Sequence, residues 1–404
     1  MHKHGNPFVL LWVTLSLLLS ASAFAGSPAG KNNILSSKLR FSGYLKFLQT
    51  TTFLDGIDNI VTNNLIHHRL NFHYYPIADL QIALEARNRI FFGEVVKLTN
   101  AASSLGLLPR YSKQIENDDL YPLTLLVLDR EALVWQIMLD RAYLRFSRNK
   151  FELTAGRQRI NWGMTLVWNP NDIFNAYSFY DFDYEERPGS DALRLVCYPN
   201  TTSSLELAGK IAYRKADIVA AALYRFNKKR YDFQFFSGVH QTDWVAGAGW
   251  AGHIGNAGFK GELSYFHPYE KLSSPEGVFL GTFSFDYSFK NNLYLNGSFL
   301  YSTAGSMHTD SLLQVFDVSV KNLSPYRYNI LSQIMYPFTP ILNGALAVQY
   351  SPGDDHALIL HPVLTYNIRE NWDLDLVAQI LLSGASGRYT DVAELLFFRI
   401  RWSY

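Results

Sequence analysis

The stretch Leu395-Leu396-Phe397-Phe398-Arg399-Ile400-Arg401-Trp402-Ser403-Tyr404 ends the chain and alternates between two kinds of side chain. One set of alternate positions is apolar or aromatic throughout: Leu396, Phe398, Ile400, Trp402 and Tyr404. The other set includes Arg399, Arg401 and Ser403. Because successive side chains of a β-strand point to opposite faces of the sheet, this period of two predicts a strand with one apolar face and one polar face.

The same period recurs upstream. In residues 372–380, Asp373, Asp375 and Gln379 fall on one face, and the other face is apolar: Trp372, Leu374, Leu376, Ala378 and Ile380. Polar turns at 351–355 and 369–371 separate such segments. The pattern predicts about 18 strands, at 39–47, 65–75, 80–89, 141–146, 151–158, 191–198, 203–213, 217–226, 231–238, 243–253, 258–266, 278–288, 292–301, 328–336, 343–351, 356–367, 372–380 and 395–404.

These strands predict an all-β fold, a closed transmembrane antiparallel β-barrel. Bacterial single-chain barrels have an even number of strands. Sixteen is the alternative, because the connections at 214–216 and 227–230 are short or fit either end of the barrel. The chain is 48% hydrophobic and 15% aromatic, a composition that also fits a large soluble β protein.

The N-terminus favours the exported barrel. Lys3 precedes an apolar run at residues 8–19 and the small-residue site Ala23-Phe24-Ala25, a pattern that predicts a signal peptide cleaved after residue 25. An uncleaved anchor helix would need about 20 apolar residues. We therefore expect a signal peptide at 1–25, a short periplasmic segment at 26–37 and the barrel at 38–404.

The last strand adds a location. An apolar alternation that ends on an aromatic residue resembles the assembly signal of Gram-negative outer-membrane barrels, and its candidate residues are Phe398, Ile400, Trp402 and Tyr404. The resemblance implies the barrel-assembly machinery as a partner, a setting of outer-membrane lipid and lipopolysaccharide, and two periplasmic termini. The longest connections, at 93–140, 164–189, 303–325 and 383–392, would then lie outside.

Charge and cysteine content exclude several classes. Removing Lys3 from the 36 basic residues leaves 35, against 35 acidic ones, and a neutral total argues against a nucleic-acid binder. A single Cys197 allows no internal disulfide and no cysteine-based metal site. His67, His68 and His73 do not predict a metal site, because neighbouring strand residues point to opposite faces. We expect no cofactor.

Basic residues gather on the inward positions of five strands. The alternation places nine of them there: Arg40, Lys46, Arg69, Arg87, Arg89, Arg141, Arg145, Arg399 and Arg401. The last strand pairs with the first in a closed barrel, so the five strands would form one continuous basic wall, with only Glu85 near its middle. This wall either attracts anions into a pore or pairs with carboxylates and stiffens the barrel.

The connection at 164–189 is far longer than the typical hairpin connection of about 2–5 residues. It is rich in aromatic residues, and its acidic members are Asp172, Asp181, Asp183, Glu185 and Glu186. We expect it to fold into the lumen and set a constriction opposite the basic wall. An outward cap is the alternative, and the rival segment is 93–140, whose apolar residues 123–135 suggest a helix.

Residues 156–163, Gly-Arg-Gln-Arg-Ile-Asn-Trp-Gly, and 169–175, Asn-Pro-Asn-Asp-Ile-Phe-Asn, resemble a strand-end motif of porin-like outer-membrane proteins, the alginate-export-like and related Gram-negative barrels. Strict alternation from Phe151 would point Arg157 and Arg159 at lipid, so we expect a bulge at Gly156 or a position above the hydrocarbon.

These features predict a porin or substrate-selective channel for small hydrophilic solutes, with a preference for anions or acidic saccharides, and not an enzyme. A barrel enzyme would need a Ser, His and carboxylate arrangement, and no spacing singles one out. A structural or adhesion barrel with a filled lumen is the other alternative, supported by inward apolar residues such as Phe266, Leu300 and Ile359.

Overall fold

The computed structural model describes residues 38–404 apart from 55–57, 117–119, 176–188, 272–275, 306–318, 354 and 386–387. The expected signal peptide at 1–25 and the segment at 26–37 lie outside the described residues. The strands are β1 (Leu39–Phe53), β2 (Ile60–Ile77), β3 (Leu80–Gly93), β4 (Thr124–Asp129), β5 (Leu133–Arg148), β6 (Phe151–Gln158), β7 (Ser190–Asn200), β8 (Ser203–Lys210), β9 (Val219–Lys228), β10 (Tyr231–His240), β11 (Asp243–Ile254), β12 (Ala257–Pro268), β13 (Val278–Ser288), β14 (Tyr294–Ser302), β15 (Tyr328–Thr339), β16 (Leu342–Ser351), β17 (Asp355–Arg369), β18 (Trp372–Ala385) and β19 (Arg388–Ser403).

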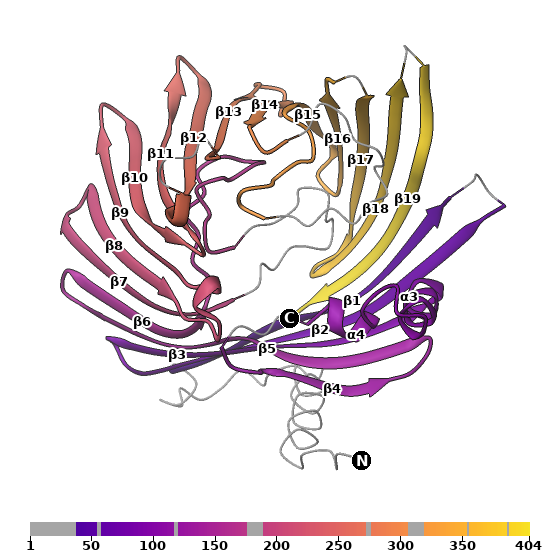
Figure 1. The fold of residues 1–404 in the computed structure, drawn as a ribbon, viewed down its shortest axis with the longest axis horizontal. Helices are drawn as coiled ribbons and strands as arrows, with labels where there is room; N and C mark the ends of the chain where they lie inside the picture. Colours follow the sequence, from indigo (N-terminus) through magenta and orange to yellow (C-terminus); the bar gives the residue numbers. More distant parts are fainter. Residues whose placement is uncertain are drawn as a thin grey trace.

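Eighteen of these strands close into one antiparallel ring (Figure 1). β1 pairs with both β2 and β19, β2 pairs with β3, and β3 pairs directly with β5. From β5 onward, each strand pairs with the next. The expected barrel of about 18 strands is therefore confirmed, and every predicted strand overlaps an observed one.

β4 is the one described strand that is not part of the closed ring, because it pairs only with β5. It shows that the expectation of a helix at 123–135 was wrong. β4 pairs with the first half of β5, residues 134–138, and β6 pairs with the second half, residues 142–148, along the same edge. β4 therefore occupies the part of this edge of β5 that β6 leaves unpaired when it ends. The helices of this connection lie upstream, at α3 (Glu94–Ser104) and α4 (Tyr111–Gln114).

The two ends of the barrel differ in their connections. At one end, here the short-turn end, hairpins join β2 to β3, β5 to β6 and so on up to β17 and β18, and Leu39 and Tyr404 lie at the same end. Lys229 and Arg230 both have positive φ, 52° and 66°, as a two-residue hairpin turn requires. The other, long-loop end holds the connections 94–132, 159–189 and 303–327.

The strand faces are sorted by polarity as the alternation predicts. Outward positions carry large exposed apolar side chains, for example Phe235, Leu263, Phe283, Leu346 and Leu376. Inward positions hold buried polar groups, for example Gln234, Glu262, Thr282, Ser284 and Gln349. No helix in the described ranges is long and apolar enough to cross a membrane.

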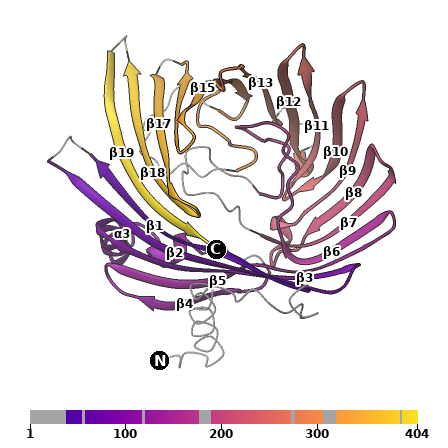
Figure 2. The ribbon, with the colours of Figure 1, turned by 180° about the vertical axis from the view of Figure 1, so that it is seen from behind.

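The buried core lies inside the ring and has two parts. The first contains residues 160–174 and residues 320–323, packed on the inner faces of strands from β7 to β15. Figures 1 and 2 show these two segments within the barrel, on the β11 to β15 side. The second part packs α3 and α4 against β1, β2, β3, β5, β18 and β19, through Val96, Tyr111, Leu65 and Val377 among others.

Candidate functional site

The predicted basic wall is continuous. Arg401, Lys46, His67 and Arg89 stand directly opposite one another across β19, β1, β2 and β3. In the next row toward the short-turn end, Tyr44, Arg69 and Arg87 are opposite one another. Lys46, Arg69, Arg87, Arg141 and Arg399 are all buried. These side chains therefore lie on one face of neighbouring strands.

A bulge concentrates charge in the middle of this wall. The β3–β5 register shifts opposite Glu85 and Ala86, so that Asp140 and Arg141, although consecutive, are both buried. The Asp140 carboxylate accepts hydrogen bonds from Arg69 and Arg87 at 3.0 Å, and lies 3.3 Å from an Arg141 nitrogen. Arg69 also pairs with Glu85, which the His73 ring contacts at 3.0 Å.

The wall contains more carboxylates than the sequence pattern predicted. Asp375 and Asp373 of β18 pair with Arg399 and Arg401, each at 2.8 Å. Arg145 lies 3.7 Å from Glu152 of β6. The expectation that Glu85 stands alone was therefore wrong. Asp140 was missed because the bulge reverses its facing, and the other three lie on strands beyond the five considered.

Three further members of the wall also lie against neutral groups of the described chain. The Arg40 guanidinium is exposed and lies 5.3 Å from the Tyr75 ring centre. Lys46 lies 5.3 Å from the Tyr44 ring centre. Arg89 donates to the carbonyl of Ile115 at 3.2 Å, which joins the wall to the residue after α4.

Residues 159–175, called the inner segment below, leave the wall where the sequence motif begins. Gly156 has φ 117°, and a Cβ there would lie 2.2 Å from the carbonyl oxygen of Ala142. After this kink Arg157 turns inward and pairs with Asp191 at 2.9 Å, while Arg159 is exposed. The expected bulge at Gly156 is absent from the β5–β6 register, and the chain turns there through the positive φ of the glycine.

Four side chains on the inner faces of β8, β10 and β12, outside the basic wall, hold the inner segment in the lumen. The fully buried Glu262 carboxylate of β12 accepts the backbone N–H groups of Met164, Thr165 and Asn171. Ser264 donates to the carbonyl of Pro170 at 2.9 Å. The Trp162 indole donates to Glu206 of β8 at 2.8 Å, and Gln234 of β10 donates to the Trp162 carbonyl at 2.7 Å.

Of the predicted constriction residues, only Asp172 belongs to the described chain. It is buried, and it accepts the backbone N–H of Trp162 at 3.3 Å, so it stabilises the turn of the inner segment. Asp181, Asp183, Glu185 and Glu186 lie outside the described residues. The described part of the connection thus folds inward as expected, against β8 to β12 and not against the basic wall.

The connection between β3 and β5 also enters the ring. Thr62 donates through its hydroxyl and its backbone N–H to Glu94, and these hydrogen bonds lower the pKa of the Glu94 carboxyl. Tyr111 contacts Asn63 at 3.2 Å. Further along, Asp191 accepts the backbone N–H groups of Leu120 and Tyr121 at 3.0 Å.

The last residues close the ring. Tyr404 and Gly43 exchange two backbone hydrogen bonds of 3.0 Å, and the Tyr404 hydroxyl contacts the His68 ring at 2.9 Å. Trp402 lies between the rings of Trp372 and Tyr404, at 6.3 and 5.1 Å. Phe398, Ile400, Trp402 and Tyr404 occupy alternate positions that face outward, whereas the buried Arg399 faces inward.

The described ranges contain no group of three His, Cys, Asp or Glu side chains placed to hold a metal ion. No protein-family model and no curated protein matches the chain. Solved structures do: OccAB4 of Acinetobacter baumannii superposes with a TM-score of 0.57 at 11% identity, covering 91% of this chain and 98% of that one. The outer membrane protein opdK of Pseudomonas aeruginosa gives 0.56 and 11%, covering 91% and 99%.

The chain has the fold of a porin-like outer-membrane β-barrel. OccK5 (OpdH) of Pseudomonas aeruginosa adds a third example, with a TM-score of 0.57 at 8% identity and coverage of 91% and 99%. These similarities support the porin-like class and not the alginate-export-like family that the motif at 156–163 resembles. At these identities the similarities show the fold alone.

Proposed function

We propose that the protein is an outer-membrane channel for passive diffusion of small hydrophilic solutes, with a preference for anions or acidic saccharides, and that it is not an enzyme. The observation that carries the proposal is the inward row of Arg401, Lys46, His67 and Arg89 on four adjacent strands. Rings and rows of one charge set the selectivity of pores. Among the described residues, the carboxylates that pair with members of the wall are Glu85, Asp140, Glu152, Asp373 and Asp375.

The setting forms part of the same proposal. Removal of residues 1–25 would release a barrel whose outward apolar and aromatic residues of the last strand, Phe398, Ile400, Trp402 and Tyr404, are available to the barrel-assembly machinery. Outer-membrane lipid and lipopolysaccharide would surround its apolar exterior, and the short-turn end, with both termini, would face the periplasm. The assignment to the alginate-export-like family rests on the motif alone and remains a proposal.

Ion selectivity tests the role of the basic wall. A charge about 10 Å from a passing ion contributes roughly 0.4 kcal/mol in water, which is about a twofold change in ion concentration. Because each charge raises the anion concentration and lowers the cation concentration by about the same factor, replacing Lys46 and Arg89 by Met should lower the anion-to-cation permeability ratio about sixteenfold at low salt. The measurement is the reversal potential in a planar bilayer under a salt gradient. Lys228→Met, at an exposed position of the β9–β10 turn, is the matched control.

The alternative, a structural barrel with a filled lumen, is favoured by one observation: residues 160–174 and 320–323 pack tightly on the inner faces of half the ring. Phe266 and Leu300, the apolar inward residues, are buried in this cluster. A correctly assembled wild-type barrel that passes no ionic current would support this alternative against the channel. An unchanged permeability ratio in the double variant would assign the basic wall a purely structural role.

A further inference from the structure

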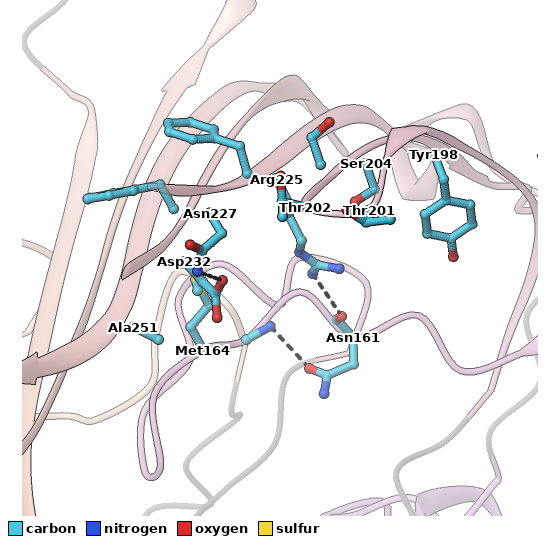
Figure 3. Close-up of a pocket in the computed structure, with 14 residues that line it drawn as sticks. Asn161, Met164, Tyr198, Thr201, Thr202, Ser204, Arg225, Asn227, Asp232 and Ala251 are labelled. Atoms are coloured by element: carbon cyan, nitrogen blue, oxygen red, sulfur yellow. Dashed lines mark hydrogen bonds between the residues drawn. The ribbon is translucent and has the colours of Figure 1, made fainter. Parts of the chain in front are cut away.

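A cavity of about 720 Å³ lies at the short-turn end, between the inner segment and the wall of β7 to β11. Figure 3 shows the residues around it. The inner segment contributes Asn161, Gly163 and Met164, and the two hairpins β7–β8 and β9–β10 contribute most of the rest, among them Tyr198, Ser204, Arg225 and Asp232. None of the nine residues of the basic wall lines this cavity.

The cavity is lined by polar groups with unused hydrogen-bonding capacity. Tyr198, Thr201, Ser204, Asn161 and Asp232 line it, and their three hydroxyls, the Asn161 amide nitrogen and one Asp232 carboxylate oxygen have no hydrogen bond to any described residue. Three of these residues carry a hydroxyl, which both donates and accepts. The set therefore offers donors and acceptors together, in a space that is large enough for a small solute.

The neighbouring groups are fixed in position. In Figure 3, Asn227 donates to the other Asp232 oxygen at 2.8 Å, and Arg225 donates to the Asn161 carbonyl at 3.4 Å. The Asn161 side-chain oxygen accepts the Gly163 N–H at 3.1 Å, which leaves its amide nitrogen available. The polar lining thus has defined orientations, which is the condition for selective binding.

The charge in the cavity is balanced, in contrast to the basic wall. Arg225 donates to Gln234 at 3.2 Å and lies 3.9 Å from Glu206, while Asp232 supplies an opposite charge in the same cavity. The balance gives an anion no advantage over a neutral solute. The Tyr198 ring and Met164 add apolar surface, on which the C–H face of a sugar ring packs well.

We propose that this cavity is a binding subsite for an uncharged saccharide unit, held by Tyr198, Ser204, Asn161 and Asp232. The subsite rests on the proposed function only in that a solute must be able to enter the lumen. It deepens that function by giving the barrel two chemically different binding regions: a basic wall for acidic groups and a neutral, hydroxyl-binding cavity between the inner segment and strands β7 to β11.

The test uses maltose, an uncharged disaccharide, titrated calorimetrically into the full mature chain in detergent. We expect saturable binding. Removing one hydrogen-bonding group should then weaken it about three- to tenfold, both in Tyr198→Phe, which keeps the ring, and in Asp232→Ala. Tyr294→Phe is the matched control, since Tyr294 lines a separate cavity of about 630 Å³ at the same end. Heat-dependent gel mobility verifies that each variant forms the barrel.

Absence of saturable maltose binding to a barrel that conducts ions would overturn the subsite and leave the channel intact. An equal loss of affinity in Tyr294→Phe would place the sugar elsewhere and also overturn it. Binding of glucuronate in the absence of maltose binding would do the same, because a charged group would then be the determinant. Maltose binding that responds to Tyr198 and Asp232 in a barrel without conductance would uphold the subsite and contradict the channel.

Discussion

At the scale of single residues, one carboxylate makes three of the hydrogen bonds that hold the inner segment in place. Glu262 is fully buried and accepts three backbone N–H groups of a segment about one hundred residues earlier in the chain, at a separation of 98 for Met164. A buried carboxylate with charge-assisted hydrogen bonds holds its partners strongly, and its removal leaves donors without acceptors. The position of the inner segment therefore depends on a residue of the wall.

Glu262→Ala tests this dependence. Each buried donor left without a partner costs about 1–3 kcal/mol, so we expect the inner segment to detach while the ring stays closed. Single-channel conductance should rise and become noisier, with unchanged membrane assembly. The control is Asp286→Ala, which removes a carboxylate of β13 that pairs with Lys260 of β12. Conductance equal to wild type in an assembled Glu262→Ala barrel would show that other contacts suffice to hold the segment.

Sequence reasoning reached part of this residue-scale detail. Alternation placed Arg87 and Arg399 on the inward face, where both side chains are buried, because facing is a local property of a strand. It did not give the partners of these charges. Asp140 was hidden by a bulge, and the partners of Glu262 are backbone groups, which leave no trace in side-chain chemistry.

At the scale of elements, the strands with one lipid face and one lumen face were predictable, and β4 was not. Its sequence, Thr-Leu-Leu-Val-Leu-Asp, is apolar at consecutive positions and so lacks the period of two. It forms a strand because β5 offers an unpaired edge once β6 has turned into the lumen at Gly156. That free edge exists only in the folded barrel, and the sequence of residues 124–129 does not indicate it.

The junction of β4, β6 and β7 depends on one buried ion pair. Arg157 and Asp191 form two hydrogen bonds of 2.9 Å, and Asp191 also accepts from Leu120 and Tyr121. Asp191→Ala should therefore lower the free energy of unfolding by about 3–5 kcal/mol, because a buried guanidinium loses its counter-charge.

The measurement is the temperature at which the barrel loses its folded gel mobility, which we expect to fall in Asp191→Ala. Asp217→Ala breaks the exposed pair with Arg214 and serves as control, with an expected change of about 0–1 kcal/mol. If both variants unfold at the same temperature, the junction is held by its backbone pairing and not by the ion pair.

At the scale of the whole molecule, the closed ring has a direct experimental signature. Every wall strand is paired on both sides, so detergent has no free edge from which to separate strands. We predict that the mature protein fractionates with outer membranes and migrates differently on gels before and after boiling. Recovery in the soluble periplasmic fraction would rule out the membrane barrel.

The inner segment has a consequence for the order in which the molecule forms. Its anchors, Glu206, Gln234 and Glu262, lie on β8, β10 and β12, all of which follow it in the chain. The segment is therefore synthesised before the strands that receive it, and Trp162 stays without its ring partner Phe236 until β10 is in place. We expect the nascent barrel to pass through a stage with a wide bore and exposed aromatic rings, when it is most vulnerable to proteases and most dependent on chaperones.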